Sequence, residues 1–226
     1  MKTDVVLLPG LHGTTALFDT FIRLAPAWAR CRAVPLPAEG PQDFDTLAQT
    51  LYQSLRSLEG IVLVAESFSG PIAARLSRLL TTKVALLVLC NPLVEASLVI
   101  PPRLAVSLLS LRFLPAWSVG LLMAGGSSTL GTAILHEVRS LPNDTLLKRI
   151  EVAQWSGPRD LVDHAHPPLL AIISNADFLV AASSRNAALS SIPFTTIAEL
   201  QGPHLIIQAR PTEVWTAISS EFASAA

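Results

Sequence analysis

Residues 61–71 read Ile61-Val62-Leu63-Val64-Ala65-Glu66-Ser67-Phe68-Ser69-Gly70-Pro71, and the pattern of these residues indicates a strand followed by a tight turn. The first four side chains are β-branched or leucine and carry no charge, as a strand buried on both faces requires. From Ile72 to Leu80 apolar residues recur at helical spacing. The segment therefore predicts a buried strand, a very tight turn with Ser67 at its tip, and a helix.

Steric crowding in a tight turn explains why small residues stand on both sides of Ser67. A turn that lifts a serine hydroxyl clear of a sheet edge brings the strand and the helix close together, and bulky side chains would clash there. The pattern is a nucleophile elbow with Ala65 and Ser69 where glycines usually stand. The following helix N-terminus would place the N–H of Phe68 to stabilise an oxyanion. A plain strand-to-helix turn that happens to contain a serine stays open at this point.

The composition favours one domain with a large core. The chain has 226 residues, of which 50% are hydrophobic and 15% charged, so it can bury much apolar surface. The net charge of −1 offers no electrostatic reason to expect nucleic acid as a partner. Cys31 and Cys90 lack metal-ligand spacing, and the apolar run before Pro9 is too short for a signal peptide. We therefore expect buried thiols and a reducing, cytoplasmic setting.

Apolar strands alternate with helical patterns along the chain. The predicted strands lie at 5–8, 33–36, 61–64, 84–90, 169–174 and 194–197, and the predicted helices at 17–24, 43–58, 72–80, 181–189 and 211–222. This alternation predicts an α/β fold with a mostly parallel sheet of about six strands and helices on both faces. Ligands then bind beyond the carboxyl ends of the strands.

Two later strand ends carry the groups that a serine nucleophile needs. Asp177 follows the strand that ends at Ser174, and His204 follows Gly202-Pro203 just past the last strand. A serine requires a base, and the base requires a group that orients it. The order Ser67, Asp177, His204 is one of the known arrangements of serine hydrolases.

The chain resembles the α/β-hydrolase superfamily from Val5 to about Phe222, and is most similar to its small bacterial esterase-like members. Four motifs carry the resemblance: Leu7-Leu8-Pro9-Gly10-Leu11, Ala65-Glu66-Ser67-Phe68-Ser69-Gly70, Asn175-Ala176-Asp177-Phe178-Leu179-Val180 and Gly202-Pro203-His204. The departures are Pro9-Gly10 in place of the family's usual His-Gly, and the two small residues in the elbow. The chain also begins at what would be the family's third strand, so we expect its first hairpin to be missing.

The resemblance implies a role for each of these residues. Ser67 would attack an ester carbonyl, His204 would move the proton, and Asp177 would orient the imidazole. The N–H groups of Leu11 and Phe68 would form the oxyanion hole. Gly10 and His12 would lie against the substrate, with the loop acting through its backbone because glycine allows close approach.

Several alternatives stay open. His12 either lines the mouth of the pocket or merely satisfies the glycine-rich loop. Asp163 competes with Asp177 as the acid, and the run Asp163-His164-Ala165-His166 suggests a metal cluster at first sight. It lacks a ligand spacing of i, i+4 and precedes two prolines, so we expect a solvated loop and no metal or other cofactor.

The segment 93–167 is too long for one crossover helix. We interpret it as a helical lid inserted into a single domain that spans residues 1–226. No residue from Phe113 to Leu135 is charged, but Pro115 and several glycines argue against a membrane span. An apolar underside of the lid would imply an apolar acyl group. The segment also contains basic residues that could receive an acidic carrier protein, namely Arg103, Arg112, Arg139, Lys148 and Arg149.

The sequence thus predicts a serine hydrolase that cleaves carboxylic esters through an acyl-enzyme intermediate. One alternative keeps the site but uses substrates linked to an acyl carrier protein, as in the pimeloyl-carrier-protein methyl ester esterases, by hydrolysis or acyl transfer. Another is a non-catalytic protein that binds a small apolar ligand. A homodimer stays open, because apolar surface beyond the core is expected.

Overall fold

The computed structural model describes residues 2–93, 110–154, 167–179, 189–190, 192–193 and 195–225. The described residues form a six-stranded sheet in the order β2-β1-β3-β4-β5-β6. Every neighbouring pair of strands in it is parallel. The strands are β1 (Thr3–Leu8), β2 (Ala29–Ala33), β3 (Ile61–Glu66), β4 (Val84–Cys90), β5 (Leu169–Ser174) and β6 (Thr195–Leu200).

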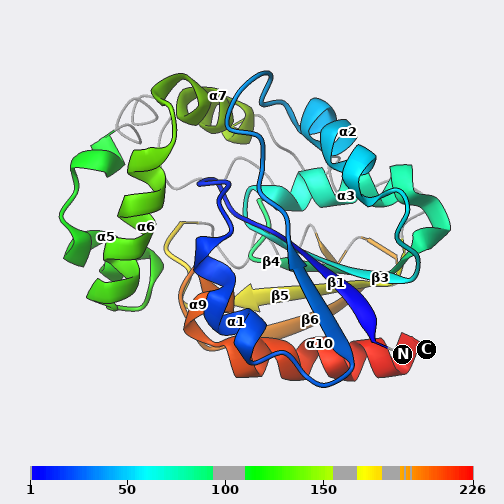
Figure 1. Cartoon of the computed structure of the whole chain (residues 1–226). Helices are drawn as coiled ribbons and strands as arrows, with labels where there is room; N and C mark the ends of the chain where they lie inside the picture. Colours follow the sequence, from blue (N-terminus) through cyan, green and yellow to red (C-terminus); the bar gives the residue numbers. More distant parts are fainter. Residues whose placement is uncertain are drawn as a thin grey trace.

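Helices cover both faces of the sheet, as the apolar strands predicted. Figure 1 shows α2 (Phe44–Leu55) and α3 (Ser69–Leu80) on one face, and α1 (Asp19–Arg23), α9 (Ile206–Ala209) and α10 (Pro211–Ala225) on the other. Successive side chains of a strand point to opposite faces of the sheet, so alternate residues pack against the helices on one face or on the other. Val6 and Leu8 join the core under α2 and α3, whereas Val5 and Leu7 join the core over α10.

A third layer of helices comes from the segment between β4 and β5. Its described residues form the short η4 (Ser110–Phe113) and the helices α5 (Ala116–Met123), α6 (Ser128–Ser140) and α7 (Asn143–Gln154). These helices lie on the side toward which the arrow of β5 points, beyond the carboxyl ends of the strands (Figure 1). They share a small apolar core of their own, which also contains Leu205 from the loop after β6.

No helix among the described residues is by itself long and apolar enough to cross a membrane. The helices α5 and α6 satisfy length and composition only when taken together, and they bend by 104° at the break between them.

One prediction about the edge of the sheet needed correction. We expected the second strand at 33–36, but β2 spans Ala29–Ala33. β2 is an edge strand, so only part of it is buried and Arg30 and Arg32 point to solvent. Pro35 and Pro37 lack the N–H groups that a longer strand would need. The expected helix at 181–189 falls almost entirely outside the described residues.

The thiol prediction was right for one cysteine. Cys90 on β4 is buried, whereas Cys31 on the edge strand β2 is only half-buried, and both are free. Burial raises the pKa of both thiols, which makes them less reactive as nucleophiles.

Candidate active site

Ser67 sits in a strained turn between β3 and α3. Its φ is +48°, a left-handed conformation that costs energy for any residue other than glycine. The Ser67 N–H donates to the carbonyl of Cys90 at 2.9 Å, and the Ser67 carbonyl accepts from Gly70 N–H at 2.9 Å. A Cβ at Gly70 would lie 2.8 Å from Cβ of Pro92, so only glycine fits there. The close packing that we predicted for the elbow is therefore real.

Ser69 also has a defined role, although it replaces a glycine. Its hydroxyl is fully buried and donates to the carbonyl of Pro9 at 2.5 Å. This bond links the elbow to the loop after β1, so the serine adds a connection between two parts of the site.

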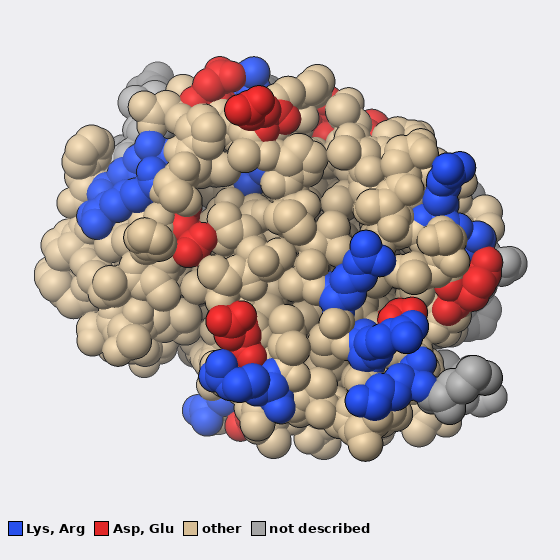
Figure 2. Space-filling model, in the orientation of Figure 1, with Lys and Arg blue, Asp and Glu red and all other residues tan. Residues whose placement is uncertain are grey.

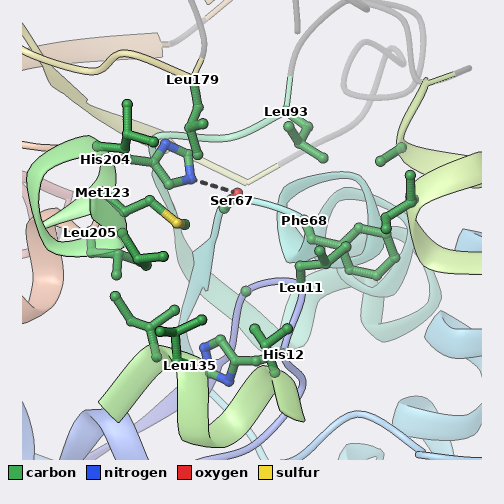
Figure 3. Close-up of a pocket in the computed structure, with 17 residues that line it drawn as sticks. Leu11, His12, Ser67, Phe68, Leu93, Met123, Leu135, Leu179, His204 and Leu205 are labelled. Carbon is green, nitrogen blue, oxygen red and sulfur yellow. Dashed lines mark hydrogen bonds between the residues drawn. The ribbon is translucent and has the colours of Figure 1, made fainter. Parts of the chain in front are cut away.

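The structure brings Ser67, His204 and Asp177 into one hydrogen-bonded row. The His204 Nε2 atom lies 2.9 Å from Ser67 Oγ, and Nδ1 lies 2.7 Å from Asp177 Oδ2 (Figure 3 shows the first contact). The side chains of His204 and Asp177 are almost completely buried, at 3% and 0% exposure. The other Asp177 oxygen accepts from Leu179 N–H at 2.8 Å, which fixes the carboxylate. In this arrangement the serine hydroxyl can donate to Nε2 while Nδ1–H donates to the carboxylate.

Asn91 fixes the loop that carries His204, a role that we did not predict from the sequence. Its side-chain amide donates to the carbonyl of His204 at 2.6 Å and to the hydroxyl of Ser174 at 2.7 Å. Its side-chain oxygen accepts from Ser174 N–H at 2.8 Å. Asn91 has φ +44° and is fully buried. A polar Asn-Pro pair directly after a buried strand was the signal that could have revealed it.

The backbone expected to form an oxyanion hole is held from two sides. The carbonyl of Gly10 accepts from Gly13 N–H at 3.0 Å, and this orients the peptide that carries the N–H of Leu11. The carbonyl of Leu11 accepts from Arg149 Nη1 at 2.8 Å. Within the described residues, neither Leu11 N–H nor Phe68 N–H has a hydrogen-bond acceptor, so both donors are available to a ligand.

Arg149 on α7 is fully buried, which the sequence did not indicate. Besides Leu11, its guanidinium donates to Gln42 at 2.8 Å and to the carbonyl of Pro37 at 2.7 Å. It also lies 6.0 Å from the ring of Phe68. Desolvation lowers its pKa to about 10. Since it is inaccessible, Arg149 is not a surface cation for a carrier protein, contrary to that part of our interpretation.

Glu66 is a buried carboxyl group next to Ser67 in the chain. One oxygen accepts from Gln208 Nε2 at 3.3 Å, and the backbone of Gly10 also donates to this carboxyl group. Burial raises its pKa from 4.5 to about 7, although His204 and the two hydrogen bonds oppose this rise. At a given pH, a larger fraction of Glu66 is therefore protonated than of an ordinary glutamate.

An apolar pocket opens onto Ser67. Its cavity volume is ≈ 160 Å³, close to that of an engineered cavity of about 150 Å³ that takes up benzene. The space therefore suits a short or medium apolar group. The segment between β4 and β5 contributes about half of the lining, namely Leu93, Val119, Leu122, Met123, Ile134, Leu135, Val138, Ile150 and Ala153. The rest of the lining is Gly10, Leu11, His12, Ser67, Phe68, Leu179, His204 and Leu205.

His12 is buried and uncharged at neutral pH. Desolvation and the nearby Arg149 lower its pKa to about 4. Its Nδ1 atom accepts from Thr14 N–H at 3.2 Å and lies 3.1 Å from the Thr14 hydroxyl. The ring therefore both satisfies the glycine-rich loop and lines the pocket, so the two interpretations of His12 are compatible.

The described residues contain no group of three or more His, Cys, Asp or Glu side chains that could hold a metal ion. The run Asp163 to His166 lies outside the described residues, so its interpretation as a solvated loop stays a prediction.

Comparison with known proteins supports the architecture. A search of solved structures finds a hydrolase from Oleispira antarctica with a TM-score of 0.86 and 14% identity, covering 99% of this chain and 92% of that one. A bromoperoxidase from Bacillus anthracis has a TM-score of 0.82 and 19% identity, with coverage of 99% and 92%. The chain has the α/β-hydrolase fold. An esterase from Exiguobacterium antarcticum, at 16% identity, TM-score 0.77 and coverage of 98% and 92%, has this α/β-hydrolase architecture too.

These similarities concern the fold alone, because the identities are low. No family model matches the sequence of this α/β-hydrolase-fold chain, and no curated protein matches it.

Proposed function

We propose that this protein is a serine hydrolase that cleaves carboxylic esters with an apolar acyl group. The observation that carries the proposal is the hydrogen-bonded row from Ser67 through His204 to Asp177, at the floor of an apolar pocket. A buried carboxylate, an imidazole and a hydroxyl in this order are the parts that serine acylation needs.

In the proposed reaction, Ser67 Oγ attacks the ester carbonyl while His204 Nε2 takes the hydroxyl proton. The N–H groups of Leu11 and Phe68 donate to the oxyanion, and His204 returns the proton to the leaving alcohol. Water then attacks the acyl-enzyme, again with His204 as base, and releases the acid. Asp177 holds the imidazole in the tautomer with hydrogen on Nδ1 and stabilises its cation. We further propose that the segment 93–167 acts as a lid, since its helices supply much of the apolar lining.

A covalent probe tests the catalytic role of Ser67. A fluorophosphonate should label the wild-type protein at Ser67, and Ser67→Ala should abolish the labelling. Ser69→Ala is the matched control, because the Ser69 hydroxyl donates a hydrogen bond to the carbonyl of Pro9 and should not react. An unlabelled wild type would favour the non-catalytic binding protein instead.

The acid is tested by comparing Asp177→Asn with Asp163→Asn. We expect Asp177→Asn to reduce kcat roughly 10⁴-fold on a p-nitrophenyl ester, as loss of the orienting carboxylate does elsewhere. Asp163→Asn should leave kcat within about twofold. The reverse result would assign the acid to Asp163.

The substrate class is tested with a chain-length series of p-nitrophenyl esters and one carrier-linked methyl ester. We expect a maximum in kcat/KM at a short or medium acyl chain, because the cavity is small. Turnover of the carrier-linked ester alone would instead support the carrier-protein alternative.

A further inference from the structure

The apolar pocket contains one polar group that neither the fold nor the proposed reaction uses. The Nε2 atom of His12 is buried and has no hydrogen-bond partner among the described residues. Figure 3 shows the His12 ring among the lining side chains, away from the dashed contact between His204 and Ser67. Leaving a buried donor or acceptor unpaired is costly, so a group of this kind in a pocket calls for an explanation.

The tautomer of His12 follows from its other nitrogen. The N–H of Thr14 can only donate, so Nδ1 of His12 must be the acceptor in that contact. A neutral imidazole then carries its hydrogen on Nε2. Because the pKa of His12 is lowered to about 4, the ring stays neutral in ordinary buffers. The unpaired atom is therefore an N–H donor.

The charge of the ligand follows from the rest of the lining. Among the residues that the structure describes, none that lines the pocket is Lys or Arg. Arg149 is close, but each of its three guanidinium nitrogens already donates to a protein oxygen. A carboxylate in the cavity would be desolvated without a lining cation, which is strongly unfavourable. An uncharged acceptor oxygen is the partner that fits.

We propose that His12 Nε2–H binds an uncharged oxygen within the acyl chain, so that the preferred substrates are esters of ether-, keto- or hydroxy-substituted acids. This inference rests on the proposed esterase function, because that function places the acyl chain in the pocket. His12 thereby selects among acyl groups of equal length, while the apolar lining selects for size.

The experiment is an oxygen scan of a six-carbon acyl chain. One methylene of p-nitrophenyl hexanoate is replaced by an ether oxygen at successive positions, and each kcat/KM is divided by the rate of hydroxide hydrolysis of the same ester. We expect one position to exceed the all-carbon ester about fivefold, since one hydrogen bond is gained. The other positions should fall below it, because their oxygens are buried without a donor.

Variants of His12 then identify the donor. His12→Phe keeps a ring of similar shape and should abolish the advantage of that position, whereas His12→Gln keeps an N–H donor and should restore part of it. His136→Phe is the matched control, because His136 lies exposed on α6 outside this pocket, and it should retain the wild-type profile. A flat wild-type profile, or an advantage that survives in His12→Phe, would overturn the inference.

A binding measurement separates this inference from the proposed function. The same acyl chains, as methyl esters, are titrated calorimetrically into Ser67→Ala, which needs no turnover. The same oxygen position should bind about fivefold more tightly than the all-carbon chain. Tighter binding in a protein without esterase activity would retain the His12 site and refute only the catalysis, whereas equal affinities would refute the His12 site itself.

Discussion

Ser67 and Asn91 both adopt left-handed backbone conformations, and both lie where the site requires an unusual direction of the chain. The turn at Ser67 exposes the hydroxyl to the pocket, and the turn at Asn91 brings its amide to the carbonyl of His204. Each conformation is held by hydrogen bonds to neighbouring strand ends. Strain of this kind is stored at a site only when the surroundings impose it.

At Glu66 the raised pKa predicts how stability depends on pH. The folded protein binds this proton more tightly than the unfolded chain, so the stabilisation is complete below pH 4.5 and is lost as the pH rises through about 7. Glu66→Gln removes the titration. We therefore consider the free energy of unfolding of Glu66→Gln minus that of wild type. This difference should increase by about 3 kcal/mol as the pH rises from 4.5 to about 8, because only wild type loses the stabilisation.

Urea unfolding at several pH values measures this difference. Glu39→Gln is the control, because it removes a carboxyl group from the exposed surface and leaves the buried Glu66 in place. A difference between Glu66→Gln and wild type that does not vary with pH would show that Glu66 titrates as an ordinary glutamate.

A comparison of alanine substitutions at Gly13 and Gly40 isolates the effect of packing against Arg149. Both have positive φ, so alanine at either position costs about 1–2 kcal/mol of backbone strain. A Cβ at Gly13 would lie 2.3 Å from Arg149 Nη1, whereas no atom of the described residues lies within 4 Å of a Cβ at Gly40. We expect Gly13→Ala to cost ~1–3 kcal/mol more than Gly40→Ala in thermal unfolding.

The same pair should differ in activity as well. Displacement of Arg149 releases the carbonyl of Leu11, so kcat should fall in Gly13→Ala and stay unchanged in Gly40→Ala. Equal losses for the two variants would mean that Arg149 does not position the loop.

At the scale of elements, α5 and α6 approach each other through two glycines. A Cβ at Gly131 would lie 2.3 Å from the carbonyl oxygen of Ala116, and one at Gly120 would lie 2.5 Å from that of Ser127. Because Val119 of α5 and Ile134 of α6 both line the pocket, the spacing of these helices sets its width. Close backbone contact here is thus a determinant of pocket size.

Gly131→Ala should push α5 and α6 apart. We expect a loss of ~1–3 kcal/mol in the free energy of unfolding, as overpacking usually causes. The maximum of the p-nitrophenyl ester series should also move to longer acyl chains. Thr132→Ala, at an exposed position on the same helix, should change neither measurement. A stable variant with the original chain-length profile would contradict this account.

Most elements could be predicted because their patterns are local. The apolar strands β1, β3, β4 and β5 are buried on both faces over most of their length, and so they are recognisable from composition. The bounds of the edge strand β2 were predicted wrongly, because the strand has only five residues and most of them are partly or fully exposed. The four-residue α9 is too short to show a helical period.

At the scale of the whole molecule, the row of Ser67, His204 and Asp177 depends on the complete sheet. Ser67 follows β3, while Asp177 and His204 follow β5 and β6, so His204 contacts a serine 137 positions away. The carboxyl ends of parallel strands lie at the same edge of a sheet, and all three residues follow such ends. The sequence was therefore sufficient to predict that they lie close together. The buried contacts of Arg149 could not be predicted, because they depend on loops that meet only in three dimensions.

The surface of the molecule is unevenly charged, and one face of the third layer is strongly apolar. Figure 2 shows that the region over α5 and α6 carries few charged residues. Here Phe113 is 84% exposed and Trp117 is 65% exposed. Exposed apolar patches commonly mark a contact surface, so the homodimer stays a prediction with a defined location.

The double variant Phe113→Ser/Trp117→Ser tests this location. If two copies associate through the patch, wild type should sediment as a dimer and the variant as a monomer. Leu24→Ser is the control, because Leu24 is 49% exposed but lies at the end of α1, away from the patch. A wild type that is monomeric at high concentration would exclude this dimer.

The buried Arg149 limits how modular the inserted segment can be. Exchange of segments between related enzymes is a common way to alter specificity. In this protein, residues 93–167 are the segment that such an exchange would replace. A chimera that replaced it would also delete the guanidinium that holds the carbonyl of Leu11. Under the proposed function, donor segments should yield active chimeras only when they supply an equivalent cation, because the acyl pocket and the position of Leu11 would both depend on this segment.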